Sequence, residues 1–568
     1  MLSDFIDMNN KKDKSELFFI PLGGVSEIGM NLAVYGYGTA ENKQYLIVDM
    51  GVSFADEQFP GADLIMPDIS FLEGENINIV GMVITHGHED HYGAVAELWP
   101  YLHVPIYCTA FTSHLLQSKF GKDFEFEKLP INIFNPGDSF GVGNFHIDTI
   151  RVNHSIPEAV ALAIKTPAGT VVHTGDWKID NTPSLDDLTD IEKFKKVGDE
   201  GVLALICDST NAMVEDHNES ELDVAKTLDG IIAKASGRVA ITSFSSNIGR
   251  IKTIIDIARK NGRKVLLMGR SIKRSVSIAV ELGYINDDDH TFITETEYNT
   301  IDRNKVVVIL TGSQGEPRAA LSKLAKFEIK SINFTSGDIV IYSSRIIPGH
   351  EKRVFDIQNA LIEQGVKLIT NNDEKVHVSG HAKREELRMM YSWVKPKVLV
   401  PVHGHPMHIA AHMELGRECG IENVIKIKDG DILKLDLSSL GVVDRAPVGL
   451  LFKDGKLLGE EVDLGIKMRK RLSRVGHVIL ALIINKKGCA VGTPRLVLRG
   501  VPDYDEDGND IAIQLQYSID DYVSEVPMKV IRNKNDLSNG CSRVINKFFD
   551  DIWGKRPVVD VIIEYLNH

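Results

Sequence analysis

The feature that most constrains this chain is the segment HGHEDH (86–91), which holds three histidines, one glutamate and one aspartate in six positions. The preceding stretch, INIVGMVI (77–84), is apolar and β-branched, and predicts a buried strand. The following stretch, YGAVAELWPYL (92–102), predicts the start of a helix. The segment therefore stands at a strand-to-helix turn, the edge where α/β proteins usually build their sites.

The spacing within this segment suits metal binding. His86 and His88 are two residues apart, so on extended backbone their side chains point to the same side. Asp90 and His91 follow where the chain turns and can present ligands from another direction. Imidazole and carboxylate groups bind zinc and related first-row metals, and four ligands in two directions favour two ions over one. The alternative is a polar loop with solvated histidines. That alternative does not explain why so many such residues directly follow a buried strand.

Length and composition exclude several classes of protein. At 568 residues the chain exceeds what one core usually supports, so two or three domains are expected. The sequence contains no run of about 18 apolar residues, so no membrane span is predicted. The polar segment 1–16 predicts a loose tail rather than a signal peptide. Five cysteines without CxxC spacing fit reduced cytosolic thiols. The net charge of −15 argues against a general positive field for nucleic acid, although bound metal can reverse the sign within a cleft.

The pattern along the chain divides it into parts. Over 17–215, strand-like runs alternate with Gly, Pro and Asn turns, the order of an α/β fold. Over 216–360, the helical spacing in SNIGRIKTIIDIARKNG and strands such as KVLLMG and KVVVILTG predict an inserted doubly wound unit. The alternation of strand-like runs and turns seen over 17–215 returns over 361–445, with the buried strand KVLVPV. A connector over 446–467 and a final α/β segment over 468–568 follow.

Three further strand ends carry residues that can complete a site for two metals. His154 follows the strand-like FHIDTIRV, Asp176 follows GTVVHTG, and His403 follows VLVPV. Each alone is more often a satisfied loop residue than a ligand. Together with the segment 86–91 they supply seven ligands, enough for two metals that share Asp176. On composition alone, His405 and His408 compete with His403, and the residues leave that choice open.

At this point the motifs resemble the metallo-β-lactamase superfamily and, more narrowly, the bacterial ribonucleases J of its β-CASP branch, over nearly the whole chain. HGHEDH is the superfamily motif, and NHSIPEA, HTGDWKID and CDSTNA resemble the later motifs of the branch. HVSGHA and PVHGHP resemble its distal histidine motifs, while SFSSNIGR, TGSQGEP and YSSRIIPGHE resemble the inserted domain. The resemblance implies an α/β fold: an αββα metallo-β-lactamase sandwich with an inserted doubly wound β-CASP domain and a small α/β C-terminal domain.

The resemblance also gives each part of the chain a name. The expected parts are a flexible tail (1–16), the first part of the metallo-β-lactamase domain (17–215), the β-CASP domain (216–360), the second part of the metallo-β-lactamase domain (361–445), a linker (446–467) and a C-terminal assembly domain (468–568).

The implied metal site holds two zinc ions per chain, with manganese also possible at a site rich in histidine and carboxylate. The resemblance selects His403, and not His405, as a ligand, and Asp176 as the bridge. Asp49 in VDMG resembles a structural element more than a ligand. The two ligand groups are His86, His88 and His154 on one ion, and Asp90, His91 and His403 on the other.

The resemblance further implies residues for proton transfer and for substrate phosphates. We interpret His381 in HVSGHA as the proton donor to the departing ribose 3′ oxygen, oriented by Asp208 in CDSTNA. Without the resemblance, an Asx turn explains Asp208 equally well. Phosphates are expected at two helix N-termini, where free N–H groups attract anions, with plain helix capping as the alternative. The residues expected to contact substrate are Ser246, Asn247, Ile248, His377, Val378, Ser379, Gly380 and His381.

The implied function is that of a cytoplasmic metal-dependent ribonuclease in RNA maturation and decay, a 5′-to-3′ exonuclease that prefers 5′-monophosphate ends and also cuts internally. The alternatives are a mainly endonucleolytic ribonuclease, a small-substrate metallo-hydrolase and an inactive RNA-binding scaffold. The inserted unit argues against a small substrate, and the full ligand set argues against a scaffold. Expected partners are RNA, further copies of the chain in a homodimer or homotetramer, and RNA-degradation partners such as a helicase or the ribosome, with no membrane.

Overall fold

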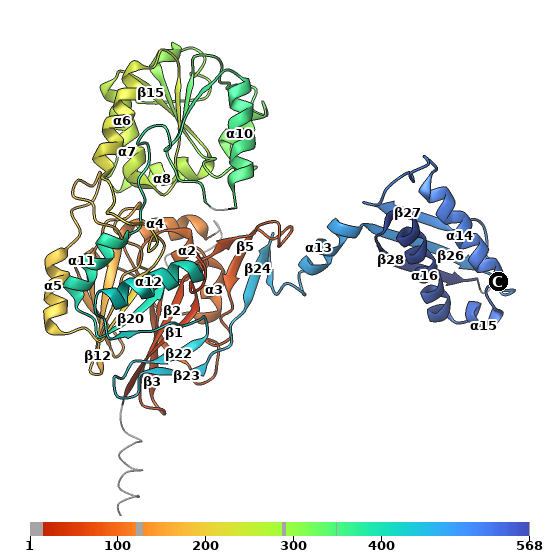
Figure 1. Cartoon of the computed structure of the whole chain (residues 1–568), viewed down its shortest axis with the longest axis horizontal. Coiled ribbons are helices and arrows are strands. Elements are labelled where there is room, and N and C mark those ends of the chain that lie inside the picture. The colour runs from red at the N-terminus through yellow and green to blue at the C-terminus, as the bar shows by residue number, and fades with distance from the viewer. Residues whose placement is uncertain (1–14, 121–128, 287–290, 348, 567–568) are drawn as a thin grey trace, which may run out of the picture. The chain divides into compact units, whose positions relative to one another are not determined.

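The computed structural model describes residues 15–120, 129–286, 291–347 and 349–566 (Figure 1). The predicted flexible tail lies outside the described residues, except for its last two positions. The chain divides into two compact units: a larger one, Met1–Ser53 with Met66–Gly449, and a smaller one, Phe54–Ile65 with Leu450–His568.

The larger unit contains an eight-stranded sheet in the order β23-β22-β1-β2-β3-β6-β7-β8. Strands β1, β2 and β3 pair antiparallel, and β3, β6, β7 and β8 run parallel. The predicted strand before the histidine cluster is β6. The strands span β1 (Glu16–Gly23), β2 (Leu32–Gly38), β3 (Lys43–Val48), β6 (Asn78–Val83), β7 (Ile106–Cys108), β8 (Ile131–Ile133), β22 (Asp431–Lys434) and β23 (Gly441–Arg445).

A seven-stranded sheet in the order β21-β20-β13-β12-β11-β10-β9 packs against the first. Tyr35 and Leu46 of the first sheet share a buried cluster with Leu162, Ile206 and Val400 of the second. Such face-to-face packing removes the apolar inner faces of both sheets from water. The strands span β9 (Ser139–Val142), β10 (Phe145–Arg151), β11 (Val160–Thr166), β12 (Gly169–His173), β13 (Ala204–Asp208), β20 (Val398–Val402) and β21 (Asn423–Val424).

Helices cover the outer faces of this sandwich. On the second sheet, Phe194 of α5 and Trp393 of α11 join Leu205 and Leu399 in a further buried cluster. The architecture is therefore the predicted αββα sandwich. Its helices span α2 (Glu89–Tyr92), α3 (Val95–Leu102), α4 (Ala110–Lys119), α5 (Ile191–Glu200), α11 (Arg384–Val394) and α12 (Pro406–Glu418).

An inserted domain interrupts the sandwich between β13 and α11. Its six strands are all parallel, in the order β16-β15-β17-β14-β18-β19, with α6 and α7 on one side and α10 on the other (Figure 1). This is the predicted doubly wound unit, and its last strand lies beyond residue 360. The strands are β14 (Val239–Thr242), β15 (Lys264–Met268), β16 (Phe292–Ile293), β17 (Val306–Leu310), β18 (Ile339–Tyr342) and β19 (Lys367–Ile369). The helices are α6 (Glu221–Lys234), α7 (Ile248–Lys260), α8 (Arg270–Glu281), α9 (Ala320–Ala325) and α10 (Glu351–Glu363).

The smaller unit has a three-stranded sheet in the order β27-β26-β28. Leu480 and Leu482 on one face of the sheet pack with Leu515 and Ile545 of two helices. A short sheet, β25-β24-β5-β4, lies nearer the start of this unit in sequence. The elements are β4 (Ser53–Phe54), β5 (Leu64–Pro67), β24 (Leu450–Asp454), β25 (Leu457–Gly459), α13 (Ile466–Val475), β26 (His477–Ile484), β27 (Arg495–Arg499), α14 (Ile511–Glu525), α15 (Met528–Ile531), α16 (Lys534–Trp553) and β28 (Val558–Tyr565).

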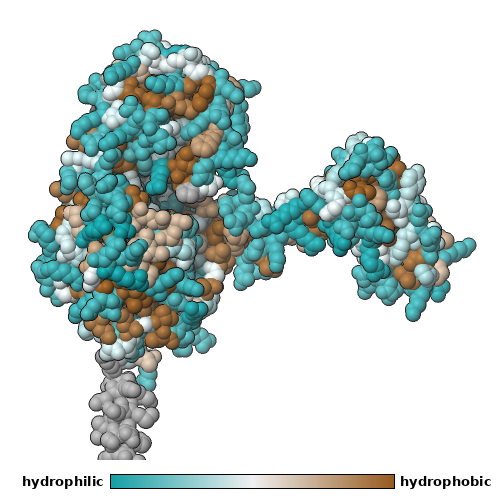
Figure 2. All heavy atoms as spheres, in the orientation of Figure 1, coloured by the Kyte–Doolittle hydropathy of each residue, from teal (hydrophilic) through white to brown (hydrophobic). Residues whose placement is uncertain are grey.

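The visible surface is mostly hydrophilic, with apolar areas scattered over it (Figure 2). Among the described residues, no helix is both long enough and apolar enough to cross a membrane.

Candidate metal centre

The predicted ligands all stand at or just beyond the ends of strands in the sandwich. Strand β6 leads to His86 and His88, and the single-turn helix α2 carries Asp90 and His91. The remaining three follow β10, β12 and β20, and are His154, Asp176 and His403. Because these strand ends meet at one edge, the structure brings all seven side chains together.

The first group contains three histidines and Asp176. The Nδ1 atom of His88 lies 3.1 Å from Nε2 of His86 and 2.9 Å from Nε2 of His154. Oδ2 of Asp176 lies 3.8 Å from Nε2 of His86 and 3.6 Å from Nε2 of His154. All four ligand atoms lie within 4.8 Å of one another, which is close enough to surround one ion.

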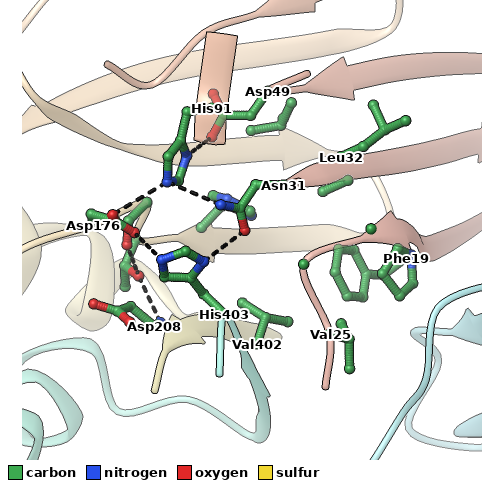
Figure 3. A pocket seen from close by; sticks show the side chains of 18 residues that line it. Phe19, Val25, Asn31, Leu32, Asp49, His91, Asp176, Asp208, Val402 and His403 are labelled. Carbon is green, nitrogen blue, oxygen red and sulfur yellow. Dashed lines mark hydrogen bonds and ion pairs between the residues drawn. The ribbon is translucent and has the colours of Figure 1, made fainter. Parts of the chain in front are cut away.

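The second group contains Asp90, His91 and His403, again with Asp176. Nε2 of His91 lies 3.2 Å from Asp176 Oδ2, and Nε2 of His403 lies 3.5 Å from Asp176 Oδ1. Figure 3 shows both imidazoles turned toward this carboxylate. Oδ2 of Asp90 lies 3.7 Å from each of the two histidines. The competing candidates, His405 and His408, belong to neither group, and His405 is exposed.

For three of the ligand histidines, hydrogen bonds behind the ring fix which nitrogen faces the centre. Nδ1 of His91 donates to Asp49 (2.7 Å), and Nδ1 of His403 donates to Oδ1 of Asn31 (2.9 Å). Nδ1 of His154 donates to the carbonyl of Gly380 (2.6 Å). In each case Nε2 is left toward the centre, the arrangement expected of metal-binding histidines.

Gly380 has to be a glycine for this contact. A Cβ atom at this position would lie 2.8 Å from Cε1 of His154, too close for a side chain. The HVSGHA loop can therefore approach the imidazole closely enough for its carbonyl to accept the hydrogen bond.

Burial and charge prepare the centre for cations. Burial lowers the pKa of His86 and His154 well below the usual value, and that of His88 to about 4. At His91, burial also acts to lower the pKa, but the neighbouring carboxylates, Asp176 first, raise it well above the usual value. Burial acts to raise the pKa of Asp176, but the surrounding histidines hold it well below its usual range. The first group thus offers neutral imidazoles, and the second offers carboxylates that favour positive charge.

Two buried polar atoms of the centre indicate whether a metal ion fits there. Oδ1 of Asp176 and Nε2 of His403 are buried, and neither has a hydrogen-bond partner among the described residues. Unpaired buried polar atoms are costly, and both atoms belong to the same group of ligands. The donor set of histidine nitrogens and carboxylate oxygens therefore fits first-row metal ions.

His381 and Asp208 lie beside this centre as an ion pair. Nδ1 of His381 donates to Oδ2 of Asp208 at 2.9 Å and lies 3.8 Å from Oδ2 of Asp176. Burial acts to lower the pKa of His381, but Asp208 and then Asp176 outweigh it and raise the pKa to about 9. Oδ1 of Asp208 also accepts from Thr210 N at 2.8 Å. The Asx turn and the contact with His381 therefore coexist.

The two segments expected to bind phosphate are tied together by one buried arginine. Asn247 caps α7 by accepting from the backbone N–H of Arg250 (2.9 Å), so the capping alternative is correct for its side chain. Nη1 of Arg250 donates to the carbonyl of Val376 (2.9 Å), and its other nitrogens pair with Glu221 (2.9 and 3.0 Å). Arg250 thus joins Asn247 to Val376, the residue just before the loop His377–His381. The segments Ser246–Ile248 and His377–His381 are here called the phosphate cradle.

The expectation that 377–381 begins a helix is wrong. Helix α11 starts at Arg384, because Glu386 accepts from the backbone N–H of Lys383 (2.7 Å) and ends the loop there. The first N–H groups of α11 are already used: Arg384 donates to Val214 O, and Glu385 donates to Asp216 O. The cradle at this position is therefore a loop, and not a helix N-terminus.

Two residues that support the centre were not predicted as part of it. Asn31 lies between His91 and His403 and contacts both (Figure 3). Asp49 contacts His91 and also accepts from Thr85 N (2.7 Å) and Thr85 Oγ1 (2.8 Å). The only signal in the sequence was the strand-end position of Asp49. Both residues line a small pocket that adjoins His91, Asp176 and His403.

The fold and the site together define a metallo-hydrolase of the metallo-β-lactamase superfamily. Family models agree with this class: "Beta-lactamase superfamily domain" matches residues 53–195, and "Zn-dependent metallo-hydrolase RNA specificity domain" matches 371–425. "Ribonuclease J, beta-CASP domain" matches 236–361, and "Ribonuclease J C-terminal domain" matches 464–565.

Curated relatives narrow the class further. Ribonuclease J of Sinorhizobium meliloti is 47% identical over 96% of this chain and 97% of its own length. Ribonuclease J of Corynebacterium glutamicum is 37% identical over 95% of this chain and 74% of its own length. That of Mycobacterium tuberculosis is 35% identical over 96% of both. The chain belongs to the ribonuclease J family and is a metal-dependent ribonuclease.

A solved structure supports the fold alone. A protein of unknown function from Enterococcus faecalis superposes with a TM-score of 0.52 at 16% identity, over 74% of this chain and all of that one.

Proposed function

We propose that this ribonuclease holds two zinc ions and degrades RNA from the 5′ end, with preference for a 5′-monophosphate, and that it also cuts internally. The observation that carries the proposal is the sharing of Asp176 by adjoining ligand groups. A third group, with Asp208, His381 and His403, contains the same carboxylate. Metal binding and proton delivery thus have a common centre.

In this proposal, Asp176 would be the ligand common to both ions. Zinc suits the donor set, and manganese would also be accepted. When bound, the ions supply an activated water and offset the charge that builds up on the phosphate. The ligands would be His86, His88 and His154 on one ion, and Asp90, His91 and His403 on the other.

His381 is the proposed proton donor. Its Nδ1 is engaged by Asp208, which leaves Nε2 to deliver a proton to the departing 3′ oxygen of the ribose. Asp208 is buried and fixes the ring through this contact. His381 is therefore the proton donor, and Asp208 is the residue that positions it.

The preference for a 5′-monophosphate rests on the phosphate cradle. Arg250 joins the helix start at Asn247 to Val376, and the loop that follows Val376 lies next to the centre, since the carbonyl of Gly380 accepts from His154. A terminal phosphate held there would place the first linkage at the ligands. A triphosphate would bring more charge and volume into the same space and would bind less well.

Matched RNAs with a 5′-monophosphate, a 5′-triphosphate or a 5′-hydroxyl test this mode. We expect mononucleotides to be released fastest from the monophosphate RNA, with products resolved by length. Equal rates on all three RNAs, with only internal fragments, would contradict the proposal and leave the mainly endonucleolytic alternative.

We also propose that the chain forms a homodimer or homotetramer through the smaller unit. One face of the β27-β26-β28 sheet packs on helices, while Ile483 and Ile562 on its other face are 45% and 52% exposed. An apolar face of this kind favours self-association. Light scattering should give a multiple of the chain mass for the wild type and a lower mass for Ile562→Glu. A monomeric wild type would contradict the proposal.

The family further supports a cytoplasmic enzyme in RNA maturation and decay. Its partners would then be RNA and RNA-degradation factors such as a helicase or the ribosome. Co-purification of such factors with tagged protein from its own cells would test this part. Factors lost on mild ribonuclease treatment would be bound through RNA, and factors retained would be bound directly.

A further inference from the structure

We propose that Asn211 is a positioning residue that sets the direction of the Ser379 hydroxyl, so that its hydrogen is offered to a substrate phosphate. The inference deepens the proposed function and rests on it, because Ser379 belongs to the phosphate cradle. Asn211 lies in CDSTNA, three residues after Asp208, and was assigned no role from the sequence.

The partners of Asn211 fix the orientation of its amide. The side chain is buried, and its Nδ2 lies 2.8 Å from Oγ of Ser379 and 2.9 Å from the carbonyl oxygen of His381. A carbonyl oxygen can only accept a hydrogen bond, so the atom that faces it must be the NH₂ group. The two hydrogens of this group therefore go to His381 O and to Ser379 Oγ.

The Ser379 hydroxyl then has both acceptor positions filled. It accepts from Asn211 Nδ2 and from the backbone N–H of His381 at 3.2 Å. A hydroxyl has two lone pairs and one hydrogen, and both of its present partners can only donate. The described residues offer no acceptor for its hydrogen. Ser379 is thus prepared to act as a donor to something outside the protein.

A phosphate is the partner that this arrangement fits. Its oxygens are strong acceptors, and a hydroxyl that donates to them forms a charge-assisted hydrogen bond. If the hydroxyl hydrogen were turned toward the protein, its lone pairs would face the phosphate oxygens and repel them. The direction of one hydrogen therefore decides whether Ser379 favours or opposes a terminal phosphate.

Asn218 supplies a matched control. Its Nδ2 also donates to the carbonyl of His381 (2.8 Å) and to Glu386 Oε2 (2.7 Å), but it does not contact Ser379. A role for Asn211 limited to holding the loop through His381 would be shared by Asn218. A role through the Ser379 hydroxyl would not be.

The experiment compares kcat/KM on RNAs that differ only in a 5′-monophosphate or a 5′-hydroxyl, with full-length, metal-loaded protein. The end preference is the ratio of the two values. We expect Ser379→Ala to lower this ratio about tenfold, the low end of what a lost hydrogen bond to a charged group costs. Asn211→Ala should lower the ratio by a smaller factor, because the Ser379 hydroxyl remains but is no longer held in one direction. Asn218→Ala should keep the wild-type ratio. The double variant Ser379→Ala/Asn211→Ala should be no lower than Ser379→Ala, since both changes act through one hydroxyl.

The outcomes separate the inference from the proposed function. If Ser379→Ala loses the preference while Asn211→Ala keeps it, the inference is wrong and the cradle stands. The inference is also wrong if Asn218→Ala loses the preference as fully as Asn211→Ala. If Ser379→Ala keeps the preference, both the inference and the cradle are wrong. Should Asn211→Ala fail to fold, Asn211→Leu keeps a branched side chain without a donor and is judged by the same ratio.

Discussion

The metal centre and the phosphate cradle adjoin each other but are built in different ways. In the centre, the chemical groups are side chains fixed at strand ends of a packed sandwich, as with His86 after β6 and Asp176 after β12. In the cradle, loops are held by residues from distant parts of the chain, as when Arg250 donates to Val376 O. We propose that the centre hydrolyses RNA and that the cradle selects which 5′ end is used.

The largest effect is expected from a change in the metal centre alone. Asp176→Ala removes the carboxylate common to both ligand groups, so hydrolysis of every RNA should fall by several orders of magnitude. The fold should survive, because the side chain is not part of an apolar cluster. Circular dichroism and RNA digestion check both points, with His405→Ala, an exposed histidine two residues after the ligand His403, as control. Near-normal hydrolysis by folded Asp176→Ala protein would refute the two-group assignment.

The next effect concerns proton delivery. His381→Ala should lower the chemical step by roughly 10² to 10⁴, the usual contribution of general acid catalysis. Its metal content should match that of the wild type. Elemental analysis of the variant makes the distinction, since loss of metal would show that His381 is a ligand.

A smaller effect is expected at Asp49, which accepts a hydrogen bond from the ligand His91. Asp49→Asn keeps the shape of the side chain but weakens its hold on His91 Nδ1. Metal affinity should fall about 10- to 100-fold, as for other partners of metal-binding histidines, and added metal should restore hydrolysis. Titration of metal-free protein measures this change. An unaltered affinity would mean that Asp49 supports the fold only.

The smallest effect should appear in the cradle alone. Ser379→Ala should cut a circular RNA, which has no 5′ end, as fast as the wild type, while its preference for monophosphate ends falls about tenfold. Asp176→Ala should cut neither substrate. A loss of activity on circular RNA in Ser379→Ala would place Ser379 in the cutting step and remove the division between the two regions.

The two regions also differ in how far the sequence predicts them. The strand β6, the turn after it and six of the seven converging side chains could be expected, because metal ligands must be particular residue types at strand ends. The seventh, His403, was separated from His405 and His408 only by the family resemblance. The contact between Asn31 and His403 could not, since it joins residues 372 positions apart through an ordinary asparagine. The start of α11 was also missed. It depends on Glu386 accepting from Lys383 N, a contact that leaves 377–381 as a loop.

We propose that the two adjoining ligand groups, which share Asp176, hold the metal ions needed for RNA hydrolysis. The most direct test titrates zinc into metal-free protein and follows bound metal and RNA hydrolysis on the same sample. We expect hydrolysis to appear as binding approaches two ions per chain, and we expect Asp176→Ala neither to reach this metal content nor to cut RNA. Full hydrolysis with no metal bound, or full metal content with full activity in Asp176→Ala, would contradict it.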